Sequence, residues 1–77
     1  MKELVEYLVK SLAEHPDSVE LTEQEFEETI SMELKISPDD LGRIIGKGGN
    51  TINAIRTVVQ AAASSHKKRA KLEVVSE

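Results

Sequence analysis

The sequence contains no cysteine, no tryptophan and only two other aromatic residues, Tyr7 and Phe26. Without cysteine, neither a disulfide framework nor a thiolate metal site can form, which is typical of a protein from a reducing compartment. With 3% aromatic residues, the chain also lacks the stacking surface on which RRM and OB-fold proteins lay successive bases. An aromatic platform for nucleic acids is therefore excluded.

Long apolar segments are absent too. No apolar run approaches the roughly 18 residues of a membrane span, and the acidic N-terminus lacks the apolar core of a signal peptide. We therefore expect a soluble, cytoplasmic protein without a membrane partner. The 77 residues leave room for one domain, residues 1–77. A chain this short buries only roughly 60% of its unfolded surface, which favours support from a partner subunit.

Residues with the spacing of a catalytic or metal site are missing as well. His15 and His66 are the only histidines, and neither has a serine, cysteine or carboxylate at the spacing of a triad or ligand set. The acids from Glu20 to Glu28 are typical of a solvated surface. We expect no catalysis, no metal and no cofactor.

Charge is divided unevenly along the chain. Residues 1–40 hold three lysines and twelve acids, a balance of −9, whereas residues 41–77 hold seven basic residues and two acids, a balance of +5. No acid occurs between Leu41 and Leu72. Such asymmetry is typical of a chain with one polyanion-binding face, although each half also fits an ordinary solvated surface. The net charge of −4 argues for limited non-specific attraction to phosphate.

Hydrophobic periodicity predicts the first three elements. Leu4, Val5, Leu8 and Leu12 recur at helical spacing, and Pro16 ends that helix. Val19 and Leu21 alternate with polar residues as a short strand, which we expect to end in a polar turn at residues 23–25. Strict alternation of Ile30, Met32, Leu34 and Ile36 with polar residues predicts a strand over residues 29–36, buried on one side.

The second half predicts two helices and a strand. Ser37-Pro38-Asp39-Asp40 is typical of a helix start, with a capping serine, a proline at the first position and acids at the positive end of the dipole. A longer helix should run from about Asn50 to Ser65, with an apolar face of Ile52, Ile55, Val59 and Ala62. Alternation over residues 70–74 predicts the last strand. The order α-β-β-α-α-β implies an α+β fold, with a three-stranded sheet and three helices on one face.

The stretch from Ile44 to Ile52 carries the functional signal. Two isoleucines precede Gly46-Lys47-Gly48-Gly49, and Ile52 restarts the apolar stripe. Glycine permits left-handed angles and close approach of another backbone, and amides at a helix N-terminus favour anions. The pattern indicates a loop that meets a phosphate backbone, with Lys47 as an added cation. Glycines that merely permit a tight turn between two helices are the alternative.

Other glycine-rich motifs do not fit. A P-loop has four residues between its first glycine and its Gly-Lys pair, whereas Gly42 and Gly46 enclose three, and Gly48 stands where a magnesium ligand belongs. A dinucleotide fingerprint needs a glycine in place of Thr51 and a strand before the turn. A DNA-binding helix-turn-helix fits poorly, since the loop is too glycine-rich and the second helix too apolar.

Gly46-Lys47-Gly48-Gly49, flanked by Ile44-Ile45 and Ile52, resembles the GXXG loop of KH domains, which holds about four nucleotides of single-stranded nucleic acid by the backbone. The whole chain resembles the KhpA family of small bacterial single-KH, type II-like proteins, with the core motif at about residues 29–75. The resemblance implies single-stranded RNA binding, RNA regulation or chaperoning, and a link to cell shape. It also implies that one or two of these isoleucines line the nucleotide groove, and the sequence leaves open which.

Further residues are candidates on either side of the loop. Arg43 and Arg56 are placed to reach phosphates near it, or are ordinary exposed arginines. Lys67, Lys68 and Arg69 form a possible basic rim, or only solvate a loop.

A second stripe on the long helix, formed by Ala54, Val58 and Ala61, is a possible dimer face, although alanine also simply favours helix. The family resemblance favours a homodimer or a heterodimer with a larger, KhpB-like protein. An adaptor that binds such a partner and contributes little RNA binding alone is the alternative function. RNA sequence, RNA against DNA, cellular pathway and dimer geometry stay open.

Overall fold

The computed structural model describes residues 1–76 and shows an α+β fold; the last residue of the expected domain, residue 77, lies outside this range. The elements are α1 (Lys2–Leu12), β1 (Glu20–Phe26), β2 (Thr29–Ile36), α2 (Leu41–Ile45), α3 (Asn50–Ser65) and β3 (Arg69–Ser76). Short 3-10 turns join them: η1 (Pro16–Ser18), η2 (Pro38–Asp40) and η3 (Lys47–Gly49). The predicted order α-β-β-α-α-β is confirmed.

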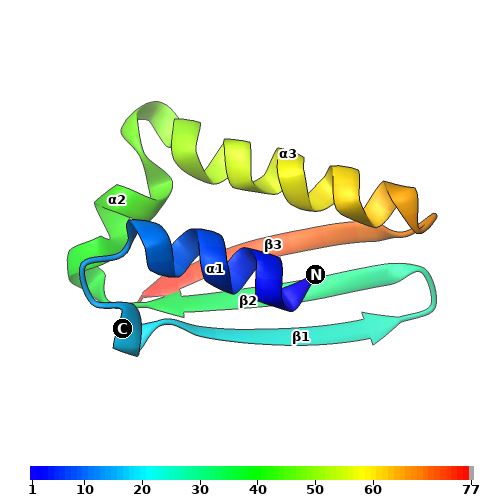
Figure 1. Ribbon diagram of the computed structural model, residues 1–77, viewed down its shortest axis with the longest axis horizontal. Coiled ribbons are helices and arrows are strands. Elements are labelled where there is room, and N and C mark those ends of the chain that lie inside the picture. The colour runs from blue at the N-terminus through cyan, green and yellow to red at the C-terminus, as the bar shows by residue number, and fades with distance from the viewer. Residues whose placement is uncertain (77) are drawn as a thin grey trace.

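The three strands form one mixed sheet in the order β1-β2-β3. β1 runs antiparallel to β2, and β3 runs parallel to it, so β1 and β3 are both edge strands. Figure 1 shows α1 and α3 lying side by side over one face of the sheet, with α2 joining this helical layer at one end. Within residues 1–76 the other face carries no helix, which gives the two-layer arrangement that the sequence predicts.

The core fills the space between the sheet and the helices. Alternate side chains of β2 point into it, since successive residues of a strand face opposite ways. Burying each of these aliphatic side chains contributes about 1.5–3 kcal/mol. The buried set is Ile30, Met32, Leu34 and Ile36 from β2, Ile52, Ile55, Val59 and Ala63 from α3, Val5 and Val9 from α1, with Val19, Leu21, Ile44 and Leu72.

The expected turn at residues 23–25 is wrong. β1 continues through them to Phe26, because Glu23 pairs with Met32 and Glu25 with Ile30 in the antiparallel ladder. The turn lies at Glu27 and residue 28, where Glu27 has a left-handed φ of 56°. Backbone hydrogen bonds to β2 hold a segment whose side chains are all exposed after Leu21, so no apolar pattern marks it as a strand.

The predicted faces of the two long helices need small corrections. In α1 the valines Val5 and Val9 are the buried residues, while Leu4 and Leu12 lie on partly exposed flanks. In α3 the last buried position is Ala63 rather than Ala62, which is half-buried. An apolar side chain at helical spacing does not reveal which edge of a stripe meets the sheet, because that depends on how the helix is rotated during packing.

Candidate nucleic-acid interface

Three glycines with left-handed backbone angles make the link between α2 and α3. Gly46 ends α2, donating its amide to the carbonyl of Gly42, and has a φ of 77°. Gly48 and Gly49 follow with φ values of 64° and 81°. Only glycine adopts such angles without a steric cost. The chain reverses within η3 and enters α3 directly at Asn50.

Space around the loop separates the roles of these glycines. A Cβ atom on Gly46 would lie 2.7 Å from the Cβ of Thr51, closer than real contacts allow. A Cβ on Gly48 would meet nothing within 4 Å. Gly46 is therefore required by its packing against the first turn of α3, whereas the surface at Gly48 is open to an incoming backbone.

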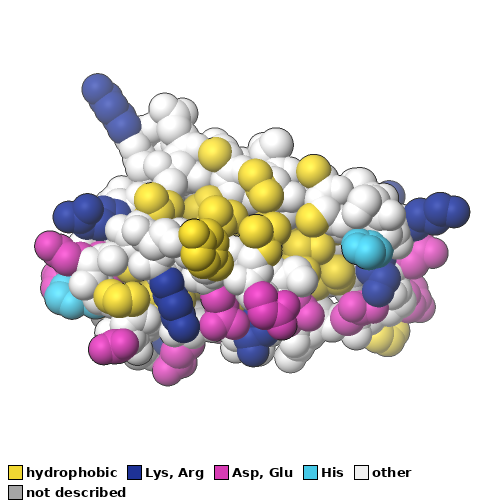
Figure 2. All heavy atoms as spheres, viewed as in Figure 1, with side chains coloured by type: hydrophobic (Ala, Val, Ile, Leu, Met, Phe, Trp, Pro, Cys, Tyr) yellow, Lys and Arg dark blue, Asp and Glu magenta, His cyan; other side chains and the backbone are white. Residues whose placement is uncertain are grey.

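The tip of the loop is exposed and holds backbone donors without partners in the described part of the chain. Gly49 donates its amide to the carbonyl of Gly46, and Asn50 donates to that of Lys47. Within residues 1–76, the amides of Lys47 and Gly48 have no acceptor. Lys47 itself is exposed and pairs with no acid in this part of the chain. Figure 2 shows a basic side chain projecting from the end of the molecule where η3 lies. These donors lie at the N-terminus of a 16-residue helix, a position that favours anions.

The three isoleucines beside the loop are not equivalent. Ile44 is fully buried, and Ile52 is almost as well buried, so both belong to the core. Ile45 packs against the core but remains half-buried. Of the three, only Ile45 offers substantial apolar surface beside the loop.

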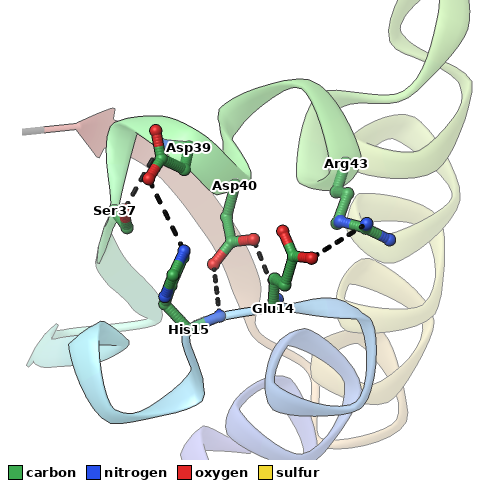
Figure 3. A network of polar contacts seen from close by, with 6 residues as sticks. All are labelled: Glu14, His15, Ser37, Asp39, Asp40 and Arg43. Atoms are coloured by element: carbon green, nitrogen blue, oxygen red, sulfur yellow. Dashed lines mark hydrogen bonds and ion pairs between the residues drawn. The ribbon is translucent and has the colours of Figure 1, made fainter.

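A buried carboxylate fixes the start of α2, which in turn positions the loop. The Oδ1 of Asp40 accepts the amide of Glu14 at 2.8 Å, and its Oδ2 accepts the amide of His15 at 2.9 Å. The side chain is completely buried. Figure 3 shows how this carboxylate reaches from η2 to the segment after α1. Asp40 therefore joins α1 to the helix pair that carries the loop.

Exposed groups surround that contact. His15 Nε2 lies 3.5 Å from Asp39 Oδ2, and Arg43 Nη2 lies 3.8 Å from Glu14 Oε1 (Figure 3). As predicted, Ser37 caps the turn by accepting the amide of Asp39 at 3.3 Å. The two aspartates, predicted only as favourable charges at a helix start, thus differ: Asp39 is exposed and Asp40 is the structural anchor.

Burial alone would raise the pKa of Asp40. Hydrogen bonds from the amides of Glu14 and His15 oppose this effect, helped by electrostatic attraction from the nearby His15 and Arg43 side chains. Together they hold the pKa of Asp40 below its usual value. The carboxylate is therefore charged at neutral pH, and the charged form is the one that holds α1 against α2.

The two candidate arginines lie in different surroundings. Arg43 is exposed on α2 and faces Glu14. Arg56 turns away from the loop toward the sheet edge, where its Nε and Nη2 both lie 3.2 Å from the carbonyl oxygen of Leu72 on β3. Arg56 is thus held in a groove between α3 and β3, which sequence spacing did not reveal.

This groove between α3 and β3 has a second polar contact. Gln60, one turn after Arg56, accepts the amide of Ala70 on its Oε1 at 3.2 Å. Its Nε2 donates to Ser64 Oγ, also at 3.2 Å. The groove is lined by Arg56, Val59, Gln60, Ala70, Lys71, Leu72 and Glu73. Gln60 was missed in the sequence because an exposed glutamine on a helix carries no pattern of its own.

The basic rim lies at the far end of α3 from the glycine loop. Lys68 forms an ion pair with Glu25 of β1, and Lys67 occupies a left-handed position with a φ of 59°. Arg69 belongs to β3 rather than to a loop and lies on the helix-free side of the sheet, since Leu72 points into the core. Lys67 and Arg69 are exposed, whereas Lys68 is half-buried and paired, so the possible basic rim at this end stays a prediction.

The stripe of Ala54, Val58 and Ala61 is exposed on the outer surface of α3, where Val58 keeps 45% of its surface accessible. It continues toward α1, because Leu4 and Ala62 line one cavity between the two helices. Figure 2 shows apolar side chains along α3 and across α1 on this side of the molecule. The helical layer thus has an apolar outer surface beside the polar groove.

Among residues 1–76, no cluster of three or more metal-ligating side chains occurs. In the same range no helix combines the length and apolarity needed to cross a bilayer.

A helix–GXXG–helix unit packed on a mixed three-stranded sheet in this order defines a KH domain. The family model described as KhpA/KhpB, KH domain, matches residues 2–74. The chain therefore belongs to the KhpA/KhpB family of KH domains.

Named relatives cover nearly all of the chain. RNA-binding protein KhpA of Clostridium perfringens is 49% identical over 75 residues, which is 97% of this chain and 100% of the relative. RNA-binding protein KhpA of Halalkalibacterium halodurans is 43% identical over 75 residues, 97% of this chain and 99% of the relative.

Two solved structures share the fold at 20% identity. Aquifex aeolicus Era bound to GDP.AlF4- aligns with a TM-score of 0.67 over 96% of this chain and 29% of that protein. Era in complex with MgGDPNP and nucleotides 1506–1542 of 16S ribosomal RNA aligns with a TM-score of 0.63, over 96% of this chain and 28% of that protein. The chain thus spans less than a third of Era.

Proposed function

We propose that this protein binds single-stranded RNA through the loop formed by residues 46–49. The observation that carries the proposal is the pair of amides at the exposed residues Lys47 and Gly48, unpaired within residues 1–76 and lying beside the charge of Lys47. Amides at a helix N-terminus together with a cation bind phosphate oxygens. The relatives named RNA-binding protein KhpA support RNA as the nucleic acid.

The bases then lie beside the loop, in the groove between α3 and β3. Ile45 supplies apolar surface at the loop, and the half-buried Ala70 lines the groove further along. Phosphate contacts position a strand and base contacts select it. In this proposal Gly46, Gly48 and Gly49 shape the contact, Arg43 adds charge on one side, and Ile44 and Ile52 act from the core by holding the two helices.

We further propose that the protein acts as a dimer, either with itself or with a larger KhpB-like protein. The apolar stripe of Ala54, Val58 and Ala61 supports this, since exposed apolar surface beside a polar rim favours protein contact. Two RNA grooves in one assembly raise the overall affinity through effective concentration. The function is regulation or chaperoning of RNA in the cytoplasm, by binding and without a catalytic step.

Charge reversal in the loop tests the RNA proposal. A Lys47→Asp, Gly48→Asp double variant places two carboxylates against phosphate, in a loop with open space at Gly48. Titration with a pool of short single-stranded RNAs, at low and at physiological salt, should show binding by the wild type and its loss in the variant. Circular dichroism checks that the variant is folded.

The opposite result has a clear meaning. If both proteins bind the RNA pool equally, the loop is only a turn between two helices. If neither binds until a KhpB-like partner is added, the protein is an adaptor, and the stripe on α3 carries its main function.

A further inference from the structure

We infer that Asn53 is a specificity-determining residue whose carboxamide binds the ribose 2′-hydroxyl next to the phosphate held by the glycine loop. Through this contact the domain favours RNA over DNA. The inference rests on the proposed function, because it concerns the strand bound at residues 46–49. It deepens that function by naming the group that separates the two nucleic acids, a choice that the sequence leaves open.

Asn53 lies over the glycine loop, although it belongs to α3. Side chains of a helix tilt toward its N-terminus, so a residue covers the backbone about four positions before it. The Nδ2 atom of Asn53 lies 3.5 Å from the position that a Cβ atom on Gly49 would take. Gly49 directly follows Gly48, whose amide is one of the two donors proposed to hold phosphate. The carboxamide therefore lies beside the site proposed for the phosphate.

The carboxamide of Asn53 is exposed, and among residues 1–76 neither its oxygen nor its nitrogen forms a hydrogen bond. Only the backbone carbonyl of this residue has a side-chain partner in that range, since it accepts the hydroxyl of Thr57 at 2.9 Å. The helix turn that carries Asn53 is fixed, because Ile52 and Ile55 on either side of it are buried in the core. A polar group on a fixed backbone loses less conformational entropy when it binds a ligand.

The chemistry of a carboxamide suits a hydroxyl better than a phosphate. A carboxamide has donors on its nitrogen and an acceptor on its oxygen, whereas phosphate oxygens only accept. A ribose 2′-hydroxyl both donates and accepts, so it can use both ends of the carboxamide. In an RNA strand the carbon that bears this hydroxyl adjoins the carbon bonded to the 3′-phosphate. A phosphate held at Lys47 and Gly48 therefore brings a 2′-hydroxyl close to Asn53.

The position of Asn53 also favours the sugar over a base. Asn53 is not among the residues that line the groove between α3 and β3, where the bases are proposed to lie. It lines a shallow hollow along α3 together with Arg56, Thr57 and Gln60. Because DNA lacks the 2′-hydroxyl, a contact with this group distinguishes RNA from DNA whatever the base.

Three pools of short single strands with the same random sequences isolate the 2′ position. The first pool is RNA, the second is 2′-deoxy with deoxyuridine in place of thymidine, and the third is 2′-fluoro. Fluorine cannot donate a hydrogen bond, yet it keeps the sugar in the pucker that RNA prefers. In fluorescence anisotropy the wild type should bind the deoxy and fluoro pools about fivefold more weakly than RNA, as expected for the loss of one hydrogen bond.

The deciding variant is Asn53→Ala, which removes the carboxamide at an exposed helical position where alanine is favourable. Its affinity for RNA should fall about fivefold, while its affinity for the other two pools should equal that of the wild type. Asn50→Ala removes the same group from the first residue of α3 and is the matched control. This control should keep the wild-type ratios among the three pools. Circular dichroism checks that both variants are folded.

The inference is wrong if the wild type binds all three pools equally, or if Asn53→Ala keeps the preference for RNA. It is also wrong if the fluoro pool binds as tightly as RNA, since the preference then comes from the shape of the sugar. Equal weakening of all three pools by Asn53→Ala would indicate a phosphate contact and would likewise overturn it.

The loop variant Lys47→Asp, Gly48→Asp separates a failure of this inference from a failure of the proposed function. If that variant binds no pool while the wild type shows no preference, only the ribose contact is wrong, and RNA binding through the loop stands. If that variant binds RNA as tightly as the wild type does, the loop is not the RNA site, and both proposals are wrong.

Discussion

Gly46 and Gly48 have similar left-handed φ angles, yet they face different surroundings. Gly46 packs against Thr51, where a Cβ atom would come within 2.7 Å of the backbone nitrogen. Gly48 has no neighbour within 4 Å of such an atom. The first glycine is therefore a packing requirement, and the second keeps a surface clear.

We accordingly expect Gly46→Ala to destabilise the protein by roughly 2–4 kcal/mol, since it combines backbone strain with overpacking against α3. Gly48→Ala should cost only about 1–2 kcal/mol, because it carries the angle penalty alone. Urea denaturation of both variants measures the difference. Equal losses of stability would mean that the contact between Gly46 and Thr51 has no energetic weight.

Asp40 should make the stability of the folded protein depend on pH in the acidic range. Because its pKa in the folded protein is lower than in the unfolded chain, its contribution to stability is present above about pH 4 and is lost as the pH falls through the folded pKa. Asp40→Asn should lower the urea midpoint at neutral pH, since an amide supplies one acceptor for two backbone donors.

The difference between wild type and Asp40→Asn should narrow in acid, where the wild-type carboxyl is protonated. Asp39→Asn, at an exposed site beside His15, is the matched control and should change the midpoint little. A constant gap between the wild type and Asp40→Asn at every pH would show that the charge of Asp40 does not matter.

Among the secondary-structure elements, hydrophobic periodicity in the sequence identified the helices and strands that bury one regular face. The strand over residues 29–36 and the helix from Asn50 to Ser65 were predicted correctly, because each packs one face against the core. β1 was shortened in the prediction, since its later half is held by the backbone ladder with β2 and exposes its side chains. The local pattern of apolar residues does not show which segments form hydrogen bonds to another strand.

The helix α3 has three faces with different surroundings. Ile52, Ile55 and Val59 pack on the sheet, Arg56 and Gln60 reach the edge of β3, and Ala54, Val58 and Ala61 remain exposed on the outside. The proposed dimer contact uses only the third face, so dimerisation and the groove should be separable by mutation.

Val58→Asp should therefore convert a dimer to a monomer in analytical ultracentrifugation while leaving the folded structure intact, because it places a charge within an apolar contact. Thr57→Asp, an exposed neighbour on the same helix, is the matched control and should remain dimeric. A Val58→Asp protein that still sediments as a dimer would place the interface elsewhere.

For the molecule as a whole, the basic residues of the second half of the chain do not gather on one surface. The glycine loop and Lys47 lie at one end, whereas Lys68 at the other end is already paired with Glu25. Sequence position predicted the loop as a site, because its glycines and its lysine are contiguous. It did not predict the buried role of Asp40 or the direction of Arg56, since both depend on residues more than ten positions away.

The loop has few basic residues near it, so RNA binding there should release few counterions from the RNA phosphates. We expect RNA affinity to fall with salt along a shallow slope of about −1 to −2 in log–log form, as for one to three contacts with a single strand. Lys47→Ala should reduce that slope by about 0.7. Titrations over a series of salt concentrations measure this slope. An unchanged slope in the variant would mean that Lys47 does not contact the RNA.

The central claim is that RNA meets this domain at the glycine loop and along the α3–β3 groove. The most direct measurement is a series of nitrogen–proton correlation spectra recorded as a short single-stranded RNA is added to the labelled protein. The account predicts that the largest shifts occur at the amides of residues 46–50 and at those of Leu72 and its neighbours. Shifts confined to the stripe of Ala54, Val58 and Ala61, or to the helix-free face of the sheet, would contradict it.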